Sequence, residues 1–123
     1  MCGTRPRIPM ADRPEIPVYS LDTRPGPDGR TTVAVAGELD LSVAPSFFTG
    51  VEEQLRQGPV FLDLSGLRFM DSSGVAALDR LMRICAREGW DLLVGSDLDR
   101  HVWQILDLTG MLGVLPFDGE VTP

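Results

Sequence analysis

The chain has 123 residues, enough for one compact domain, and its formal net charge is −7 because 18 acidic residues outnumber 11 basic ones. It contains no lysine, and its arginines are scattered along the chain. This composition disfavours a nucleic-acid binder, which needs clustered basic residues against phosphates. The hydrophobic content of 43% supports a packed core.

The longest uncharged stretches fall short of the roughly 18 apolar residues that cross a bilayer, so the sequence predicts no transmembrane helix. The first residues are polar and proline-rich, unlike the apolar centre of a secretory signal. We therefore expect a cytoplasmic protein whose Cys2 and Cys85 stay reduced. The two cysteines lack the spacing of metal ligands, and the chain has no glycine-rich motif for phosphate or dinucleotide binding, so neither a metal nor a cofactor is expected.

Prolines dominate the start of the chain, at Pro6, Pro9, Pro14 and Pro17. Each removes a backbone donor and disfavours helix in the residue before it. We expect residues 1–17 to form a flexible arm, residues 18–117 one domain, and residues 118–123 a tail. Met10 offers an alternative start of the protein, and the arm serves either as a solvated leader or as a partner contact.

The domain begins with a predicted β-hairpin. An apolar segment at 18–21 precedes the turn-rich residues 24–29 and a β-branched segment at 31–37. Alternation in the second strand places Val33 and Val35 on one face. The small side chains of the other face indicate that something packs closely over it.

A helix and a strand follow. Residues 44–57 place apolar side chains at helical spacing, with Ser42 as the expected N-cap and Gly58-Pro59 as the stop. Residues 60–64 are almost continuously apolar, which is typical of a central strand buried on both faces. Residues 65–70 are predicted to be a loop.

The rest of the chain continues to alternate helix and strand. A helix is predicted over 72–87, a strand over 90–94, a helix over 98–108 and a last strand over 112–116. Such alternation is typical of parallel βαβ units. The sequence therefore predicts an α/β fold, a small, mostly parallel sheet of about five strands led by a hairpin. Three helices can all lie on one side, which leaves the other face for the hairpin or a partner to cover.

Candidate catalytic groups are few. His101 is the only histidine, and its place near the start of a predicted helix indicates an ordinary surface or packing residue. The acidic segment 96–99 is better explained by helix capping than by metal binding. A hydrolase that used Ser72 with Asp40 or Asp71 would lack a nearby base, so we expect no enzyme and no catalytic residues.

The segment Phe69-Met70-Asp71-Ser72-Ser73-Gly74 stands at a predicted strand-loop-helix junction. Its acid and serines could simply cap the helix, since Asp and Ser are favoured at that position. They could equally form a functional site, because α/β proteins bind ligands beyond the carboxyl ends of their strands. A phosphoryl group on Ser72 would meet amides at the positive end of the helix.

Four segments in order resemble the STAS domain of bacterial anti-sigma factor antagonists. They are Gly37-Glu38-Leu39-Asp40, Leu62-Asp63-Leu64-Ser65-Gly66-Leu67, Phe69-Met70-Asp71-Ser72-Ser73-Gly74-Val75 and Leu108-Thr109-Gly110-Met111. The resemblance covers about residues 18–117. It implies a binding module with a STAS-like fold.

In that family the unphosphorylated protein binds an anti-sigma factor that is also a serine kinase, and so releases a sigma factor. The resemblance implies that phosphorylation of Ser72 breaks this complex and that a serine phosphatase restores it. Asp40, Asp71, Ser73 and Gly74 would form the surroundings of the phosphosite and contact the partner. Neither nucleic acid nor membrane is an expected partner, and the protein would be a monomer or weak dimer.

One alternative within binding modules is a STAS scaffold subunit of a stress-sensing complex or of a lipid-transport ABC system. The intact Asp71-Ser72-Ser73-Gly74 motif favours the phosphorylation switch.

Overall fold

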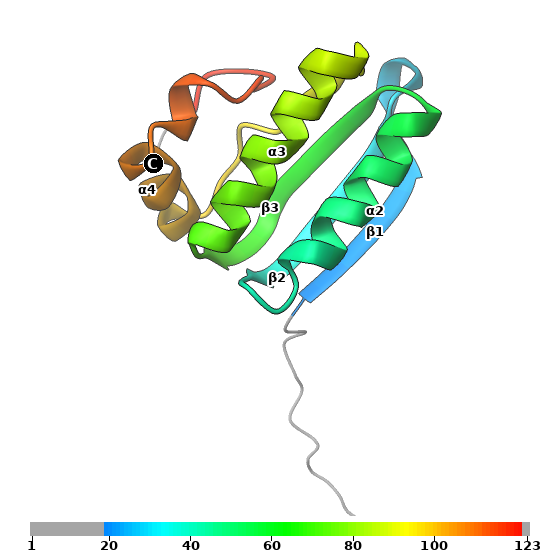
Figure 1. The fold of residues 1–123 in the computed structure, drawn as a ribbon. Helices are drawn as coiled ribbons and strands as arrows, with labels where there is room; N and C mark the ends of the chain where they lie inside the picture. The colour runs from blue at the N-terminus through cyan, green and yellow to red at the C-terminus, as the bar shows by residue number, and fades with distance from the viewer. Residues whose placement is uncertain (1–18, 122–123) are drawn as a thin grey trace, which may run out of the picture.

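The computed structural model describes residues 19–121, which form a four-stranded sheet in the order β1-β2-β3-β4 (Figure 1). The elements are β1 (Tyr19–Pro25), β2 (Thr31–Leu39), α2 (Ala44–Gln57), β3 (Val60–Met70), α3 (Ser72–Glu88), β4 (Leu92–Val94) and α4 (Arg100–Leu108). β1 and β2 pair antiparallel, whereas β2, β3 and β4 are parallel. The predicted fold class, a mostly parallel α/β sheet led by a hairpin, is confirmed.

The core lies between the sheet and helices α2 and α3. The buried stripe of α2 contains Phe47, Val51 and Leu55, and that of α3 contains Leu78 and Leu81. The strands contribute alternate residues to the same core, as period-2 alternation requires: Val33 and Val35 from β2, Val60, Leu62 and Leu64 from β3, and Leu92 and Val94 from β4. Packing of these amphipathic faces provides most of the stability of such short helices.

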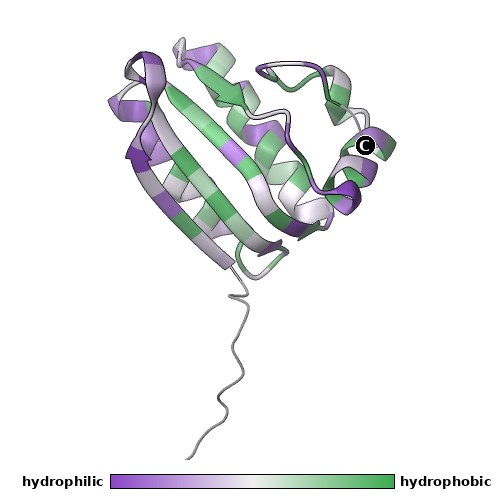
Figure 2. Ribbon diagram, turned by 180° about the vertical axis from the view of Figure 1, so that it is seen from behind, coloured by the Kyte–Doolittle hydropathy of each residue, from purple (hydrophilic) through white to green (hydrophobic). Residues whose placement is uncertain are grey.

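Helices α2 and α3 lie on the same face of the sheet (Figure 1). The two crossovers both advance one strand in the same direction, and right-handed crossovers then place both helices on one side. Figure 2 shows the opposite face, with the helices behind it. The hairpin lies within the sheet rather than over this face, and Phe61 is only half-buried. The expectation that β3 is buried on both faces was therefore wrong.

Two segments differ from their predicted structure. Residues 65–70, expected to be a loop, continue β3, because β2 runs beside them through two register shifts. Residues 112–116 were expected to be a strand. Instead, residues 112 and 113 belong to the 3-10 turn Met111–Gly113, and residues 114–116 form no strand. Only Phe117 forms a parallel bridge, to Val94, so the described residues form four strands rather than about five. Asp118, expected to lie in a tail, donates its amide to the Val94 carbonyl.

The end residues and caps of the helices and strands were predicted less accurately than their presence and order. Ser42 does not cap α2: Val43 is the N-cap and provides no side-chain bond. Asp99 caps α4 by accepting the His101 amide at 2.9 Å, which confirms capping as a role of the acidic segment. β1 extends to Pro25, whereas β4 covers only Leu92–Val94.

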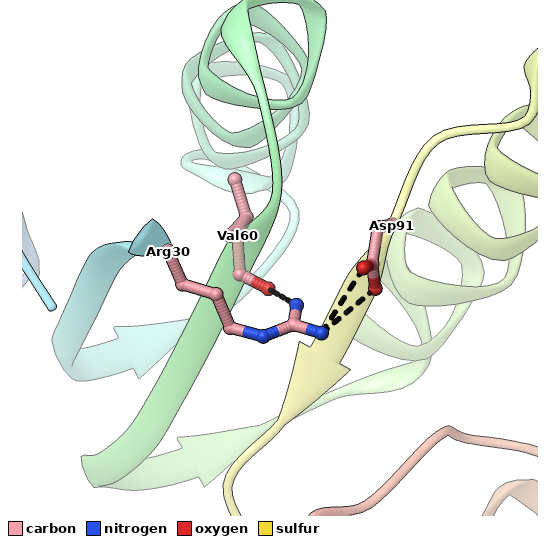
Figure 3. Close-up of polar contacts among 3 residues, drawn as sticks. All are labelled: Arg30, Val60 and Asp91. Atoms are coloured by element: carbon pink, nitrogen blue, oxygen red, sulfur yellow. Dashed lines mark hydrogen bonds and ion pairs between the residues drawn. The ribbon is translucent and has the colours of Figure 1, made fainter. Parts of the chain in front are cut away.

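Arg30 connects the strands at the end of the sheet where the parallel strands begin (Figure 3). Its guanidinium donates to the Val60 carbonyl at 3.2 Å and to both carboxylate oxygens of Asp91 at 3.0 and 3.1 Å. Arg30, directly before β2, thereby links Val60, the first residue of β3, to Asp91, which precedes β4. The opposite end, where the parallel strands finish, carries the predicted site.

Candidate functional site

The site lies at the carboxyl edge of the sheet, where β2 and β3 end side by side. Their last residues, Leu39 and Met70, are register partners, and the Asp71 amide donates to the Leu39 carbonyl at 3.2 Å. Asp40 and Asp71 each follow one of these paired residues. Because parallel neighbours lie about 5 Å apart, the two acids, far apart in sequence, stand at adjacent strand ends.

Asp71 is the N-cap of α3. Its Oδ1 accepts the Ser73 amide at 2.8 Å and the Gly74 amide at 3.3 Å. Ser72 is the first helical residue and is exposed, whereas Ser73 is half-buried. The capping interpretation of the motif is thus confirmed for Asp71, and the cap presents the Ser72 side chain to solvent.

Substitutions at Asp71 distinguish the stabilising effect of its capping hydrogen bonds from that of its charge. Asp71→Ala should lower the free energy of unfolding by about 1 kcal/mol, because two amides lose their acceptor. Asp71→Asn should stay close to wild type, since an Asn oxygen caps as well as a carboxylate. Urea unfolding of the three proteins measures this. Equal losses in both variants would show that the charge, rather than the cap, stabilises the helix start.

Gly74 allows α3 to begin close to the strands. A Cβ at this position would lie 2.6 Å from Met70 Cγ and 2.9 Å from Leu39 Cγ, closer than carbon atoms approach. Met70 and Leu39 are buried at 3% and 0% exposure, so neither can swing into solvent. Gly74 therefore sets the position of the helix start that carries Ser72.

Asp40 closes a turn between β2 and α2. Its Oδ1 accepts the Ser42 hydroxyl at 2.6 Å and the Ser42 amide at 3.0 Å. The hydrogen bond from the Ser42 hydroxyl is the main reason that the pKa of Asp40 is lowered, with smaller contributions from backbone donors. Asp40 thus adds a negative charge to the edge that carries Ser72 at neutral pH. Ser42 was expected to cap α2, and its pairing with Asp40 was not anticipated from the sequence.

Two apolar side chains are exposed at the same edge. Leu41 follows Asp40 and is 73% exposed, and Phe69 precedes Met70 and is 43% exposed. Neither residue was expected from the sequence to contact a partner, although Phe69 stands within one of the recognised motifs and Leu41 directly follows another. Exposed apolar residues that accompany a polar site are typical of a surface that binds another protein.

Two further residues with reactive side chains, His101 and Cys85, belong to α4 and α3. His101 is exposed on α4 and donates its amide to Asp99, which confirms that it is a surface residue. Burial raises the pKa of the Cys85 thiol, so its reactive thiolate form is disfavoured. Between residues 19 and 121, no group of three potential metal ligands gathers. Within the same range, no helix is long and apolar enough to cross a membrane.

The sequence matches a known domain family and a curated relative. A sequence profile described as "Mlab, STAS domain" matches residues 23–116. The Anti-sigma F factor antagonist of Paenibacillus polymyxa is 28% identical over 97 residues, which cover 76% of this chain and 82% of that protein.

Solved structures share the fold. An anti-sigma factor antagonist from Mycobacterium paratuberculosis superimposes with a TM-score of 0.68 at 23% identity, covering 80% of this chain and 84% of its own. The unphosphorylated form of the anti-sigma factor antagonist SpoIIAA gives 0.64 at 17% identity, covering 82% and 90%.

Proposed function

Because the chain belongs to the STAS domain family, we propose that it is an anti-sigma factor antagonist. In this proposal the unmodified protein binds an anti-sigma factor that has serine kinase activity, and the sigma factor is released. The relative from Paenibacillus polymyxa supports the general role. The finer assignment, a switch at Ser72, is supported by the geometry of this chain.

One observation carries the proposal: an exposed serine hydroxyl starts a helix at an edge that also presents apolar side chains. Ser72 is held there by the Asp71 cap and by the close approach at Gly74. Leu41 and Phe69 provide the apolar contact area. A partner that covers this edge would bury the Ser72 hydroxyl. Modification of this hydroxyl would therefore alter a buried part of the interface.

Phosphorylation then acts as an electrostatic switch. The Ser72 hydroxyl oxygen forms a bond to the γ-phosphorus of ATP, the bond to ADP breaks, and the hydroxyl proton leaves to solvent or to a base of the kinase. The product carries about −1.5 to −2 charges at pH 7. Asp71 already occupies the Ser73 and Gly74 amides, so the phosphate has fewer free donors than an uncapped helix would offer. Asp71 and Asp40 add like charge at this edge.

Other parts of the proposal concern how the switch is reversed and where the protein works. A serine phosphatase would remove the phosphate and restore binding. The protein would act in the cytoplasm as a monomer or weak dimer, without a cofactor and without enzymatic activity of its own. Ser73 and Gly74 would support the phosphosite rather than accept phosphate, because Ser73 is half-buried and its amide is held by Asp71.

The test is intact-mass measurement after incubation with ATP and each candidate anti-sigma kinase of the source genome. We expect one added phosphate on the wild type and on Ser73→Ala, and none on Ser72→Ala. Phosphate that persists in Ser72→Ala would overturn the assignment of the site. If no kinase modifies the protein, and partner binding ignores Ser72→Asp, the scaffold role would replace the switch.

A further inference from the structure

The face of the sheet opposite α2 and α3 is open in the described part of the chain (Figure 2). Three of its strands are parallel to one another, and parallel strands almost always have both faces covered. The centre of the open face is formed by half-buried residues of β2, β3 and β4: Ala34, Ala36, Phe61 and Leu93. These small or apolar side chains form a surface that a covering segment could approach closely.

A groove of about 440 Å³ lies at the hairpin end of this face. Phe61 and Leu93 contribute its apolar lining, and Thr32 adds a buried side chain. The hairpin turn, which contains Pro25 and Pro27, forms part of the wall.

Carboxylates surround the apolar part of the face. Asp28 and Asp118 line the groove, and Asp22 and Asp63 belong to the open faces of β1 and β3. Asp118 uses Oδ1 to accept the Ser96 amide, and Asp63 uses Oδ1 to accept from Ser65, so each retains its second oxygen for another donor. Of the two arginines that line the groove, Arg30 is already paired with Asp91, which leaves Arg24. The face therefore suits a segment that is both apolar and basic.

The first 18 residues of the chain match this description. They contain three arginines, at positions 5, 7 and 13, against one aspartate and one glutamate, whereas the other 105 residues hold eight arginines against 16 acids. They also contain Ile8, Met10, Ile16 and Val18. Their four prolines lack a backbone donor, so the segment is unsuited to extend the sheet as a regular strand beside β1.

The attachment point and the length of this segment also fit. It joins the domain at Tyr19, the first residue of the edge strand β1, and the hairpin turn lies at the other end of that strand. The seven residues of β1 span about 23 Å. A proline-rich chain advances about 3.1 Å per residue, so about eight residues before Tyr19 suffice to reach the groove.

We propose that residues 1–18 fold back across the open face of their own sheet, placing the residues around Met10 in the groove. The arginines of the segment then meet the carboxylates of the face, and its apolar side chains cover Phe61 and Leu93. This contact lies on the face opposite α2 and α3 and uses no residue of the Ser72 site. It does not depend on the proposed function.

A spin label tests the contact in the full chain. Ala11→Cys in a Cys2→Ser, Cys85→Ala background carries one nitroxide, which broadens the amide signals of nearby residues. We expect strong loss of signal intensity at Phe61 and Leu93, and little at Gln54, which lies on α2 behind the sheet. Loss that is confined to residues around Tyr19, or equal on both faces, would overturn the proposal.

Two controls define the cause. Replacing Arg5, Arg7 and Arg13 together by Glu should restore the Phe61 and Leu93 signals, because the segment would then repel the carboxylates; unchanged broadening would refute the charge argument. The second control mixes two proteins: one carries the nitroxide but no isotope label, and the other carries the isotope label but no nitroxide. The Phe61 and Leu93 signals of the isotope-labelled protein should stay unbroadened in this mixture. Broadening of the Phe61 and Leu93 signals in the mixture would show that the segment of a second copy, rather than the chain's own, covers the face.

Discussion

Ser72→Asp should weaken binding to the anti-sigma factor by about 100- to 1,000-fold, a loss of about 3–4 kcal/mol. The wild-type hydroxyl is exposed in the free protein and would be buried by the partner, so the variant must bury an uncompensated carboxylate. Asp71 and Asp40 at the same edge add repulsion. Ser72→Ala should bind like the wild type, because it removes only a hydroxyl.

A charge-matched control is available at the other end of the sheet. Gln57 is exposed at the end of α2, and Gln57→Glu adds the same single charge away from Ser72. Titration calorimetry should find this variant and the wild type nearly equal in affinity. Ser72→Asp should also keep its thermal stability, since an acid in the first turn of a helix is favourable. A parallel loss of affinity in Gln57→Glu would show that net charge, rather than position, controls binding.

Gly74→Ala should lower the free energy of unfolding by up to about 2 kcal/mol, the opposite of what helix propensity predicts. Within a helix, Ala is favoured over Gly by about 1 kcal/mol. Here the added Cβ would meet Met70 Cγ at 2.6 Å and Leu39 Cγ at 2.9 Å, and overpacking of a core costs about 1–3 kcal/mol. The overlap should exceed the gain, because both neighbours are buried.

Gly113→Ala is the matched control. Nothing lies within 4 Å of a Cβ at Gly113, so this variant should stay close to wild type in urea unfolding. Met70→Ala removes the nearest obstacle, and a double-mutant cycle with Gly74→Ala should show that the second change costs less in that background. A stabilised Gly74→Ala protein would mean that α3 can shift away from the strands, so that Gly74 does not set the position of Ser72.

The elements with strong local patterns were predicted well. α3 begins at Ser72 as expected and ends at Glu88, one residue beyond the prediction, because its apolar stripe and Gly89 mark both ends within the sequence. α2 has the predicted bounds for the same reason. The motif from Phe69 to Gly74 was placed at a strand-loop-helix junction, but in the structure no loop intervenes, because β3 runs to Met70 and α3 begins at Ser72.

Features that depend on distant residues were missed. The strand character of residues 65–70 comes from pairing with β2, and the 3-10 turn at Met111–Gly113 replaces a segment that was apolar enough to be a strand. The exposure of Leu41 and Phe69 likewise follows from the packing around them. Hydrophobic periodicity reports which face of a segment is buried, but not which segments become neighbours.

Local patterns in the sequence predicted the alternation of strands and helices and the helix that begins at Ser72, because capping and amphipathic periodicity depend on residues a few positions apart. Strand order and helix packing bring Asp40 and Asp71 to the same edge, leave no room for a side chain at Gly74, and leave one face of the sheet open. The pairing of β2 with β3 brings together residues about thirty positions apart, which no local pattern encodes.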